Sequence, residues 1–478
     1  MDRFKNIDAI FNPMAIAVIG ASRSPMKWGH IILANIIVGG YKGKIYPINP
    51  GETEIIGLKV YPHIGSTPGK VDLVMIATPA SIVPRVMEEC VAKHVGAVVI
   101  ISGGFSETGT QGAQLEQEVV RIARRGEVLV VGPNTMGVFS AQASLCALMP
   151  TVRPKEGHIA FVSQSGNLGT QMLRYGQDRG VGFAKFVSSG NEGDLHCEDY
   201  VEYFAKDQKT KVLLAYIEGI DDGRRFLEIT REISARKPIV VLKAGRTRSG
   251  ARAAKSHCGA LAGSSQIYDA VFKQAGIIKA STTEEMFDLG RAFVYLPLLR
   301  GKRVGILTWG GGWGVVTADA CEDAGLEVPD LPGESIQELD KILPPYWCRG
   351  NPVDLVGVLD RARHLKCLEI LARCEKVDGM IVLGTITGTS FFDSVIAGIS
   401  EVSAEKGERI KKELEKVDKT FANRINELMA RFKKPIIPVT MMPEGSAKTL
   451  GILTFPTPER AVKVLAKLFE YSRHSDRQ

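Results

Sequence analysis

One glycine-rich segment combines a histidine with several cations, and these residue types suit phosphoryl transfer. Residues 245–263 read GRTRSGARAAKSHCGALAG, with four basic residues and His257 among small side chains. Imidazole is a competent nucleophile at neutral pH. The neighbouring cations can neutralise a phosphoryl group in transfer, and the glycines can act as hinges. This context favours a chemical role for His257 over the surface role that is the usual alternative for an isolated histidine.

A phosphate-binding turn is predicted at the end of the apolar run 159–162, where the sequence reads SQSGNLG. A strand, a Ser/Gly turn and a helix start bring N–H groups and hydroxyls together around an anion, and the helix dipole adds to the attraction. The candidate ligands are Ser163, Ser165, Gly166 and Asn167. A helix N-cap turn without a ligand is the alternative for so short a motif.

Small and polar residues also follow three strands near the start of the chain, where ligands bind in a doubly wound sheet. A glycine at the end of the first strand lets the backbone approach a phosphate, and nearby basic residues favour an anionic ligand. The full GxGxxG pattern is absent, and Asn49 stands where a dinucleotide site would place an acidic residue, which disfavours a nicotinamide oxidoreductase. A ligand-free turn is the other alternative. The candidate ligand-binding residues are Gly20, Ser22, Arg23, Asn49, Thr78, Pro79, Ser102, Gly103 and Gly104.

The elements that must position these residues are short apolar runs that alternate with helical patterns. Continuous apolar strands separated by helices indicate parallel sheets covered on both faces. We therefore predict an α/β protein with three consecutive Rossmann- or flavodoxin-like doubly wound parallel-sheet domains, at 1–150, 151–299 and 300–478. The predicted strands are 15–19, 44–48, 73–77, 97–102 and 128–131, then 159–162, 184–187, 212–217, 239–243 and 277–280, and finally 304–308, 379–383 and 436–439.

The composition is that of an ordinary globular chain, with 478 residues of which 45% are hydrophobic and 24% charged. A net charge of +7 is mild for this length and does not by itself indicate nucleic acid. The eight cysteines are scattered without a CxxC pair, which favours a reducing compartment. No signal-peptide pattern and no long apolar run is present. We expect a cytoplasmic enzyme that binds neither nucleic acid nor membranes.

Several motifs in this order resemble one enzyme family. VIGASRS, YPINP, IATPA, ISGGFSETG and GPNTMG are similar to the CoA-binding domain of nucleoside-diphosphate-forming acyl-CoA synthetases, to which the succinyl-CoA synthetase alpha subunit is a distant relative. SQSGNLG, YIEGI and KSHCGALAG resemble the next domain of the same family. The resemblance implies that the first set of loops holds CoA, that His257 is a phosphohistidine, and that Glu218 orients it. A direct nucleophilic role for Cys258 is the alternative.

The resemblance also implies a reaction and a partner. It covers about 450 residues in family order, but the nucleotide-binding ATP-grasp domain would need about 200 more residues than three units leave. We therefore expect the alpha subunit of an ADP-forming acyl-CoA synthetase, with ADP or ATP and Mg²⁺ bound by a separate ATP-grasp beta subunit, as an α2β2 heterotetramer. The reaction would interconvert acyl-CoA, ADP and phosphate with a carboxylic acid, CoA and ATP. A non-catalytic protein that binds CoA or acyl-CoA for regulation is the alternative.

This sequence departs from the family pattern at several positions. Gly51 replaces a usual lysine, Thr135 a usual cysteine and Cys258 a usual threonine. Trp309 and Trp313 stand in a loop that usually reads NAGGPG, which indicates an altered acyl pocket or subunit contact, or a core role for the tryptophans.

Lysines and glutamates at three- and four-residue spacing over 403–433 predict a solvated helix. A helix that binds a partner is the alternative for this segment.

Overall fold

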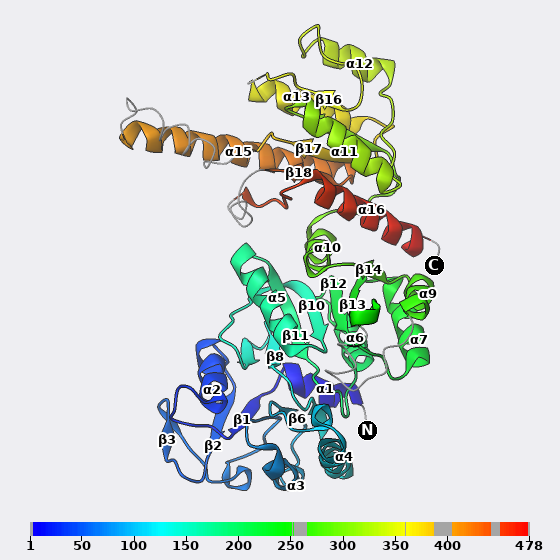
Figure 1. Cartoon of the computed structure of the whole chain (residues 1–478). Helices are drawn as coiled ribbons and strands as arrows, with labels where there is room; N and C mark the ends of the chain where they lie inside the picture. Colours follow the sequence, from blue (N-terminus) through cyan, green and yellow to red (C-terminus); the bar gives the residue numbers. More distant parts are fainter. Residues whose placement is uncertain are drawn as a thin grey trace. The chain divides into compact units, whose positions relative to one another are not determined.

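The computed structural model describes residues 3–250, 252, 265–358, 360–386, 404–440 and 450–476. The chain divides into two compact units, Met1–Met286 and Phe287–Gln478. The predicted α/β class is confirmed, because each unit contains parallel sheets between helices (Figure 1). Among the described residues, unit 1 holds two large sheets and the two-stranded hairpin β3–β4, and unit 2 holds one sheet.

The first sheet of unit 1 has five strands in the order β2-β1-β5-β6-β7, all parallel. Its strands β1 and β5 are wholly buried aliphatic runs, which require helices on both faces. Each predicted strand of this sheet is confirmed to within two residues. The elements are β1 (Ala15–Ile19), α2 (Trp28–Val38), β2 (Lys44–Ile48), the hairpin β3 (Glu54–Ile55) and β4 (Leu58–Lys59), β5 (Leu73–Ile76), α3 (Val83–Ala92), β6 (Ala97–Ile100), α4 (Thr110–Arg125) and β7 (Leu129–Val131).

Alternate residues of β1 face opposite sides of the sheet, as the period of a strand requires. Ile16 and Val18 pack in a core that includes residues of α2, whereas Ala17 and Ile19 pack in a second core with residues of α3 and α4. Since both faces are covered, the carboxyl edge of the sheet is the part left open to a ligand.

The second sheet of unit 1 has seven strands in the order β14-β13-β12-β10-β11-β8-β9. Its five parallel strands match the predicted set, with β10 and β11 longer than predicted. The hairpin β8–β9 was not predicted as strands, and β8 pairs antiparallel with β11. The elements are β8 (Gly137–Ser140), β9 (Leu145–Leu148), β10 (Lys155–Ser163), α5 (Gly166–Arg179), β11 (Gly182–Ser188), α6 (Cys197–Lys206), β12 (Val212–Ile217), α7 (Gly223–Ser234), β13 (Ile239–Lys243), α9 (Ser265–Ala275), β14 (Ile278–Ala280) and α10 (Thr283–Tyr295).

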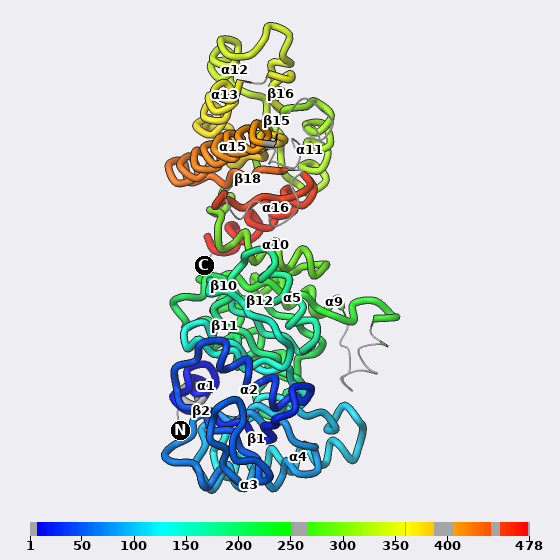
Figure 2. Tube along the Cα trace, turned by 90° about the vertical axis from the view of Figure 1, so that its left-hand side faces the viewer, coloured from blue at the N-terminus to red at the C-terminus, as the bar shows by residue number. Residues whose placement is uncertain are grey.

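Helix α1 (Arg3–Phe11) and the hairpin β8–β9 join the two sheets of unit 1. Phe11 of α1 stacks on Tyr203 of α6 with ring centroids 5.3 Å apart, and the Tyr203 hydroxyl donates to Asp8 at 2.7 Å. Figure 2 shows α1 between strands β1 and β2 of the first sheet, below it, and β11 of the second sheet, above it. The predicted first domain ends at residue 150, but the second sheet already includes β8, which begins at Gly137. The domain limits themselves stay a prediction.

Unit 2 is built on one parallel sheet in the order β16-β15-β17-β18. Its predicted strands at 304–308, 379–383 and 436–439 are confirmed residue for residue. Helices α11 and α16 pack together, as do α13 and α15. The elements are β15 (Val304–Thr308), α11 (Gly311–Asp323), α12 (Gly333–Asp340), β16 (Val353–Asp354), α13 (Arg361–Arg373), β17 (Gly379–Leu383), α15 (Ala404–Phe432), β18 (Ile436–Val439) and α16 (Pro458–Ser475).

Helix α15 was predicted as a solvated helix, and this is correct only for its first half. Phe421, Ile425 and Leu428 in the second half are at most 1% exposed. Their spacing of four and three residues places them on one face of the helix, which packs against α13. Because charged residues are frequent throughout 403–433, the sequence pattern indicates a solvated helix and does not reveal this apolar face.

None of the helices in the described part of the chain is long and apolar enough to cross a membrane.

Candidate functional site

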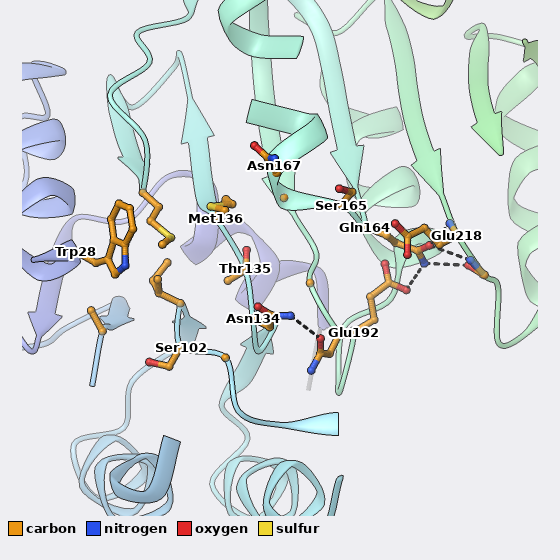
Figure 3. A pocket seen from close by; sticks show the side chains of 18 of the residues that line it. Trp28, Ser102, Asn134, Thr135, Met136, Gln164, Ser165, Asn167, Glu192 and Glu218 are labelled. Carbon is orange, nitrogen blue, oxygen red and sulfur yellow. Dashed lines mark hydrogen bonds between the residues drawn. The ribbon is translucent and has the colours of Figure 1, made fainter. Parts of the chain in front are cut away.

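The two sheets of unit 1 share one cavity of about 390 Å³. Loops from the first sheet reach it from one side, and loops at the carboxyl edge of the second sheet reach it from the other (Figure 3). Six residues predicted from the sequence line this cavity together: Ser102, Gly103, Ser165, Gly166, Asn167 and Glu218. The structure therefore unites the predicted phosphate turn, the predicted orienting glutamate and part of the predicted CoA loops.

The start of helix α5 lines the cavity near its polar end, where Gln164 and Glu218 lie (Figure 3). Ser165 is its N-cap residue, and the Ser165 hydroxyl accepts from the Leu168 N–H at 3.5 Å, so the cap bond is long. The free N–H groups of the first turn lie beside the cavity, where they can bind an anion. The phosphate contact of Ser163 stays a prediction, since its hydroxyl donates to the Ser165 carbonyl at 2.6 Å and the residue is fully buried. Ser163 shapes the turn and does not line the cavity.

Gln164 forms hydrogen bonds with three residues at the polar end of the cavity, and the sequence alone did not identify it. Its carboxamide nitrogen donates to Glu192 and to the Gly219 carbonyl, each at 2.9 Å. Its carboxamide oxygen accepts from the Glu218 N–H at 2.5 Å and from the Gly219 N–H at 3.0 Å. One side chain thus fixes the backbone of the predicted orienting glutamate.

Glu218 follows strand β12 and is 7% exposed. Its backbone is held from the other side by Lys243, the last residue of β13, whose ammonium donates to the Glu218 carbonyl at 2.8 Å. Lys243 is itself buried and lies 4.5 Å from the ring centroid of Tyr268. Burial lowers the pKa of Lys243, and the charge of Glu218 opposes that shift. In the sequence, Lys243 lies two residues before the segment 245–263 that contains His257.

Glu192 is a second carboxyl group in the cavity, and its side chain is 11% exposed. Burial raises its pKa from the usual 4.5 to about 8, against the hydrogen bonds from Ser189 and Gln164, which lower it. The Ser189 hydroxyl donates to Glu192 at 2.6 Å. Near neutral pH the Glu192 carboxyl is therefore protonated, unlike an ordinary surface glutamate.

The titration of Glu192 predicts how stability depends on pH. Between pH 4.5 and 8 the folded chain keeps a proton on Glu192 that the unfolded chain releases, so this group lowers stability as pH rises through that window. Glu192→Gln cannot titrate. We expect its melting temperature, relative to the unsubstituted chain, to increase by about 5 °C or more from pH 5 to pH 8.5. Scanning calorimetry tests this, with Glu228→Gln on α7 as an exposed control; parallel curves for Glu192→Gln would refute it.

A polar bridge joins the loop after β6 to the loop after β11. The Asn191 carboxamide donates to Glu107 at 2.6 Å and to Glu116 at 2.9 Å. Glu107 in turn accepts from the Gly104 N–H at 2.5 Å. Burial raises the pKa of Glu107, but the bonds from Asn191 and the backbone outweigh it and hold the pKa below its usual value. This ionised bridge fixes the two loops against each other beside the cavity.

The remaining predicted CoA residues lie outside the cavity: Gly20, Ser22, Arg23, Asn49, Thr78, Pro79 and Gly104. They still meet at the carboxyl edge of the first sheet. The Asn49 carboxamide donates to the Ala21 carbonyl at 2.7 Å, and a Cβ on Gly20, whose φ is +88°, would lie 2.6 Å from the Ala77 carbonyl oxygen. Close backbone packing therefore already requires glycine at position 20.

The polar side chains at this edge differ in their hydrogen-bond and ion-pair partners. Arg23 pairs with Glu52 at 2.8 Å and donates to the Glu54 carbonyl at 3.0 Å. Its side chain is nevertheless 60% exposed, so it can reach solvent anions. The Thr78 hydroxyl is buried and makes no hydrogen bond with any described residue. The Ser102 hydroxyl donates to the Thr78 carbonyl, which connects this edge to the cavity.

Several other residues were also singled out in the sequence. His257 and Cys258 lie outside the described residues. Thr135 is 2% exposed, and its hydroxyl donates to the Ser188 carbonyl, so this departure from the family pattern holds two loops together. In unit 2 the Trp309 indole donates to the Val358 carbonyl at 3.2 Å. Trp313 is 40% exposed, so a core role is wrong for that residue.

Three families match consecutive segments of the chain. A CoA binding domain matches residues 14–141, the flavodoxin domain of succinyl-CoA ligase type matches 156–293, and a Ligase-CoA domain matches 304–407. The first two matches meet at the cavity, since one contains Ser102 and the other Glu218.

Full-length comparisons agree with these matches. The chain is 38% identical to the acetate–CoA ligase (ADP-forming) I subunit alpha of Pyrococcus furiosus, over 98% of both chains. It is 42% identical to the acetate–CoA ligase (ADP-forming) I of Archaeoglobus fulgidus over 83% of its own length, but it spans only 57% of that relative. The structure of an acetyl-coenzyme A synthetase 1 from Candidatus Korarchaeum cryptofilum, in complex with phosphate and ADP, matches with a TM-score of 0.85 and 36% identity over 98% of this chain and 97% of that one. The chain therefore belongs to the ADP-forming acyl-CoA ligases and corresponds to their alpha subunits.

Proposed function

We propose that this chain carries the CoA and phosphohistidine steps of the reaction acyl-CoA + phosphate + ADP ⇌ carboxylic acid + CoA + ATP. One observation carries the proposal: the cavity that joins a loop of the CoA-binding segment to the helix start and the glutamate of the flavodoxin-like segment. A thioester held by the first loops and a phosphate held by the second would meet there. Such positioning alone can remove several kcal/mol of a reaction barrier.

The proposed chemistry has three displacements. A phosphate oxygen attacks the thioester carbonyl carbon, the C–S bond breaks, and the thiolate leaves as CoA after protonation. An imidazole nitrogen of His257 then attacks the phosphorus of the acyl phosphate, and the carboxylate leaves. Finally ADP takes the phosphoryl group from His257, which restores the free imidazole.

The roles of this chain's residues follow from the site. The first turn of α5, at Ser165, Gly166 and Asn167, would bind the phosphoryl oxygens through backbone N–H groups. Glu218 would accept from one ring N–H of His257 and so leave the other nitrogen free to attack. Gln164 and Lys243 hold the backbone of Glu218 in place for that purpose.

The first sheet edge would bind the phosphates and pantetheine of CoA. Gly20 and Ser22 present the loop after β1, and Arg23 offers an exposed cation beside it. Asn49 fixes this loop through the Ala21 carbonyl. The loops at Thr78–Pro79 and at Ser102–Gly104 complete the edge, and Ser102 extends it into the cavity.

The nucleotide half of the reaction is proposed to come from a partner. We propose an ATP-grasp beta subunit that binds ADP or ATP with Mg²⁺, in an α2β2 assembly located in the cytoplasm. The support is the relative named as an alpha subunit, whose length this chain covers to 98%. Mg²⁺ would screen the nucleotide phosphates during transfer.

The proposal predicts that turnover depends on that partner. The complex purified from its native source should form ATP from acetyl-CoA, phosphate and Mg-ADP. The isolated chain should bind CoA in calorimetry but turn over at less than about 1% of that rate, because it would lack the phosphoryl acceptor. A luciferase assay measures the ATP. Full activity of the isolated chain would refute the split of functions, and CoA binding without turnover in the complex would favour the regulatory alternative.

A further inference from the structure

The cavity of unit 1 is chemically divided. Trp28 and Met136 lie toward one end, whereas Gln164 and Glu218 lie toward the other (Figure 3). Further apolar lining comes from Ala77, Ile101 and Met149. Among the described lining residues, the charged side chains are Glu218 and Asp221, both acidic, while Glu192 is protonated near neutral pH. An uncharged acyl group therefore fits the apolar end, whereas a second carboxylate on the acyl group would meet acidic neighbours.

Met136 contacts the start of helix α5 directly. A Cβ placed on Gly166 would lie 2.5 Å from Met136 Cγ and 3.1 Å from its Cβ. The thioether side chain thus packs on the first residue of the helix whose N–H groups would bind phosphate.

The backbone of Met136 is fixed, so its position is well defined. Its N–H donates to the Ser188 hydroxyl at 3.0 Å, and its carbonyl accepts from the Met149 N–H at 2.9 Å. The side chain keeps its own freedom, as methionine has three rotatable bonds and adapts to irregular space. A fixed backbone with an adaptable side chain is suited to sort substrates by size.

We propose that Met136 sets the size limit for the acyl group. The inference rests on the proposed function. For phosphate at the α5 start to attack the thioester, the carbonyl carbon must lie about 3–3.5 Å from a phosphate oxygen. The substituent on that carbon then lies within reach of Met136, which touches the same helix start. Met149 and Trp28 extend the apolar surface beyond it.

The test compares specificity constants for acetyl-, butyryl- and hexanoyl-CoA in the complex of the chain with its partner. Met136→Ala removes the thioether and should raise the hexanoyl-to-acetyl ratio of kcat/KM about tenfold or more, since one methylene in a tight pocket is worth at least that. Met136→Val, a smaller truncation, should shift the ratio in the same direction. Met172→Ala is the matched control, because Met172 lies on α5 and is buried but does not line the cavity.

Each outcome tests either the role of Met136 or the proposed function. An equal loss for all three acyl-CoAs would place Met136 against CoA itself and overturn the inference. If Met136→Ala fails to fold, the milder truncation Met136→Val decides instead, and an unchanged ratio in that complex would overturn the inference. Absence of turnover with every acyl-CoA in the unsubstituted complex would instead refute the proposed function.

Discussion

Turnover of acyl-CoA, phosphate and ADP should fall by at least about 1,000-fold when His257 is replaced by alanine. The reason is chemical: without the imidazole there is no nitrogen to accept the phosphoryl group, and the acyl phosphate has no path to ADP. CoA binding should stay unchanged, because the CoA loops belong to the first sheet and carry none of the His257 segment. ATP formation in the complex and calorimetry with CoA measure the two effects.

A matched control separates this effect from a general loss of histidines. His63→Ala changes an exposed histidine that precedes a short helix of the first sheet domain, and it should leave turnover within about twofold of the unsubstituted complex. If His257→Ala kept more than a tenth of the turnover, the phosphoryl acceptor would be another residue, and Cys258 would be the first to test.

Glu218→Gln should slow turnover by about 100- to 1,000-fold. The amide has the shape of the carboxylate but lacks its charge, so it stabilises less well the positive charge that develops on the imidazole. The fold should tolerate the change, since Gln164 and Lys243 hold residue 218 through hydrogen bonds to its backbone. Stopped-flow measurement of chain phosphorylation, with CD spectra of both proteins, tests this expectation.

Asp221→Asn is the matched control for Glu218→Gln. Asp221 lines the same cavity, but its side chain is 82% exposed, so solvent screens its charge. The control should lose less than about fivefold in rate. Equal losses in the two variants would mean that general cavity charge, and not orientation by Glu218, controls the rate.

The fold was largely predictable because buried parallel strands are continuous apolar runs. Runs such as 15–19 and 304–308 contain valine and isoleucine without charged residues, and they occur as strands at those positions. The hairpin β8–β9 was not predictable in this way. Its strands have four residues each, and they belong to the second sheet although the first sheet precedes them. Pairing between β8 and β11 is a long-range contact that no local pattern specifies.

The site was predictable in parts but not as a whole. Ser165 and Glu218 follow strands of one sheet, so their proximity follows from parallel topology. Ser102 belongs to another sheet, and only the packing of the two sheets brings it to the same cavity. Gln164 stood inside a recognised motif, yet its carboxamide bonds to residues 192, 218 and 219 depend on loops that are distant in sequence. Met136 gave no signal, because a single methionine is usually a core residue.

The most direct test of the account is the chemistry of a phosphate label on this chain. The complex, incubated with Mg²⁺ and ATP labelled at the γ-phosphate, should transfer label to the chain at His257. A phosphohistidine is lost in mild acid and survives alkali, because protonation of its nitrogen makes a good leaving group. The account predicts label that disappears at low pH, persists at high pH and is absent from His257→Ala. Label that survives acid, or that persists in His257→Ala, would contradict it.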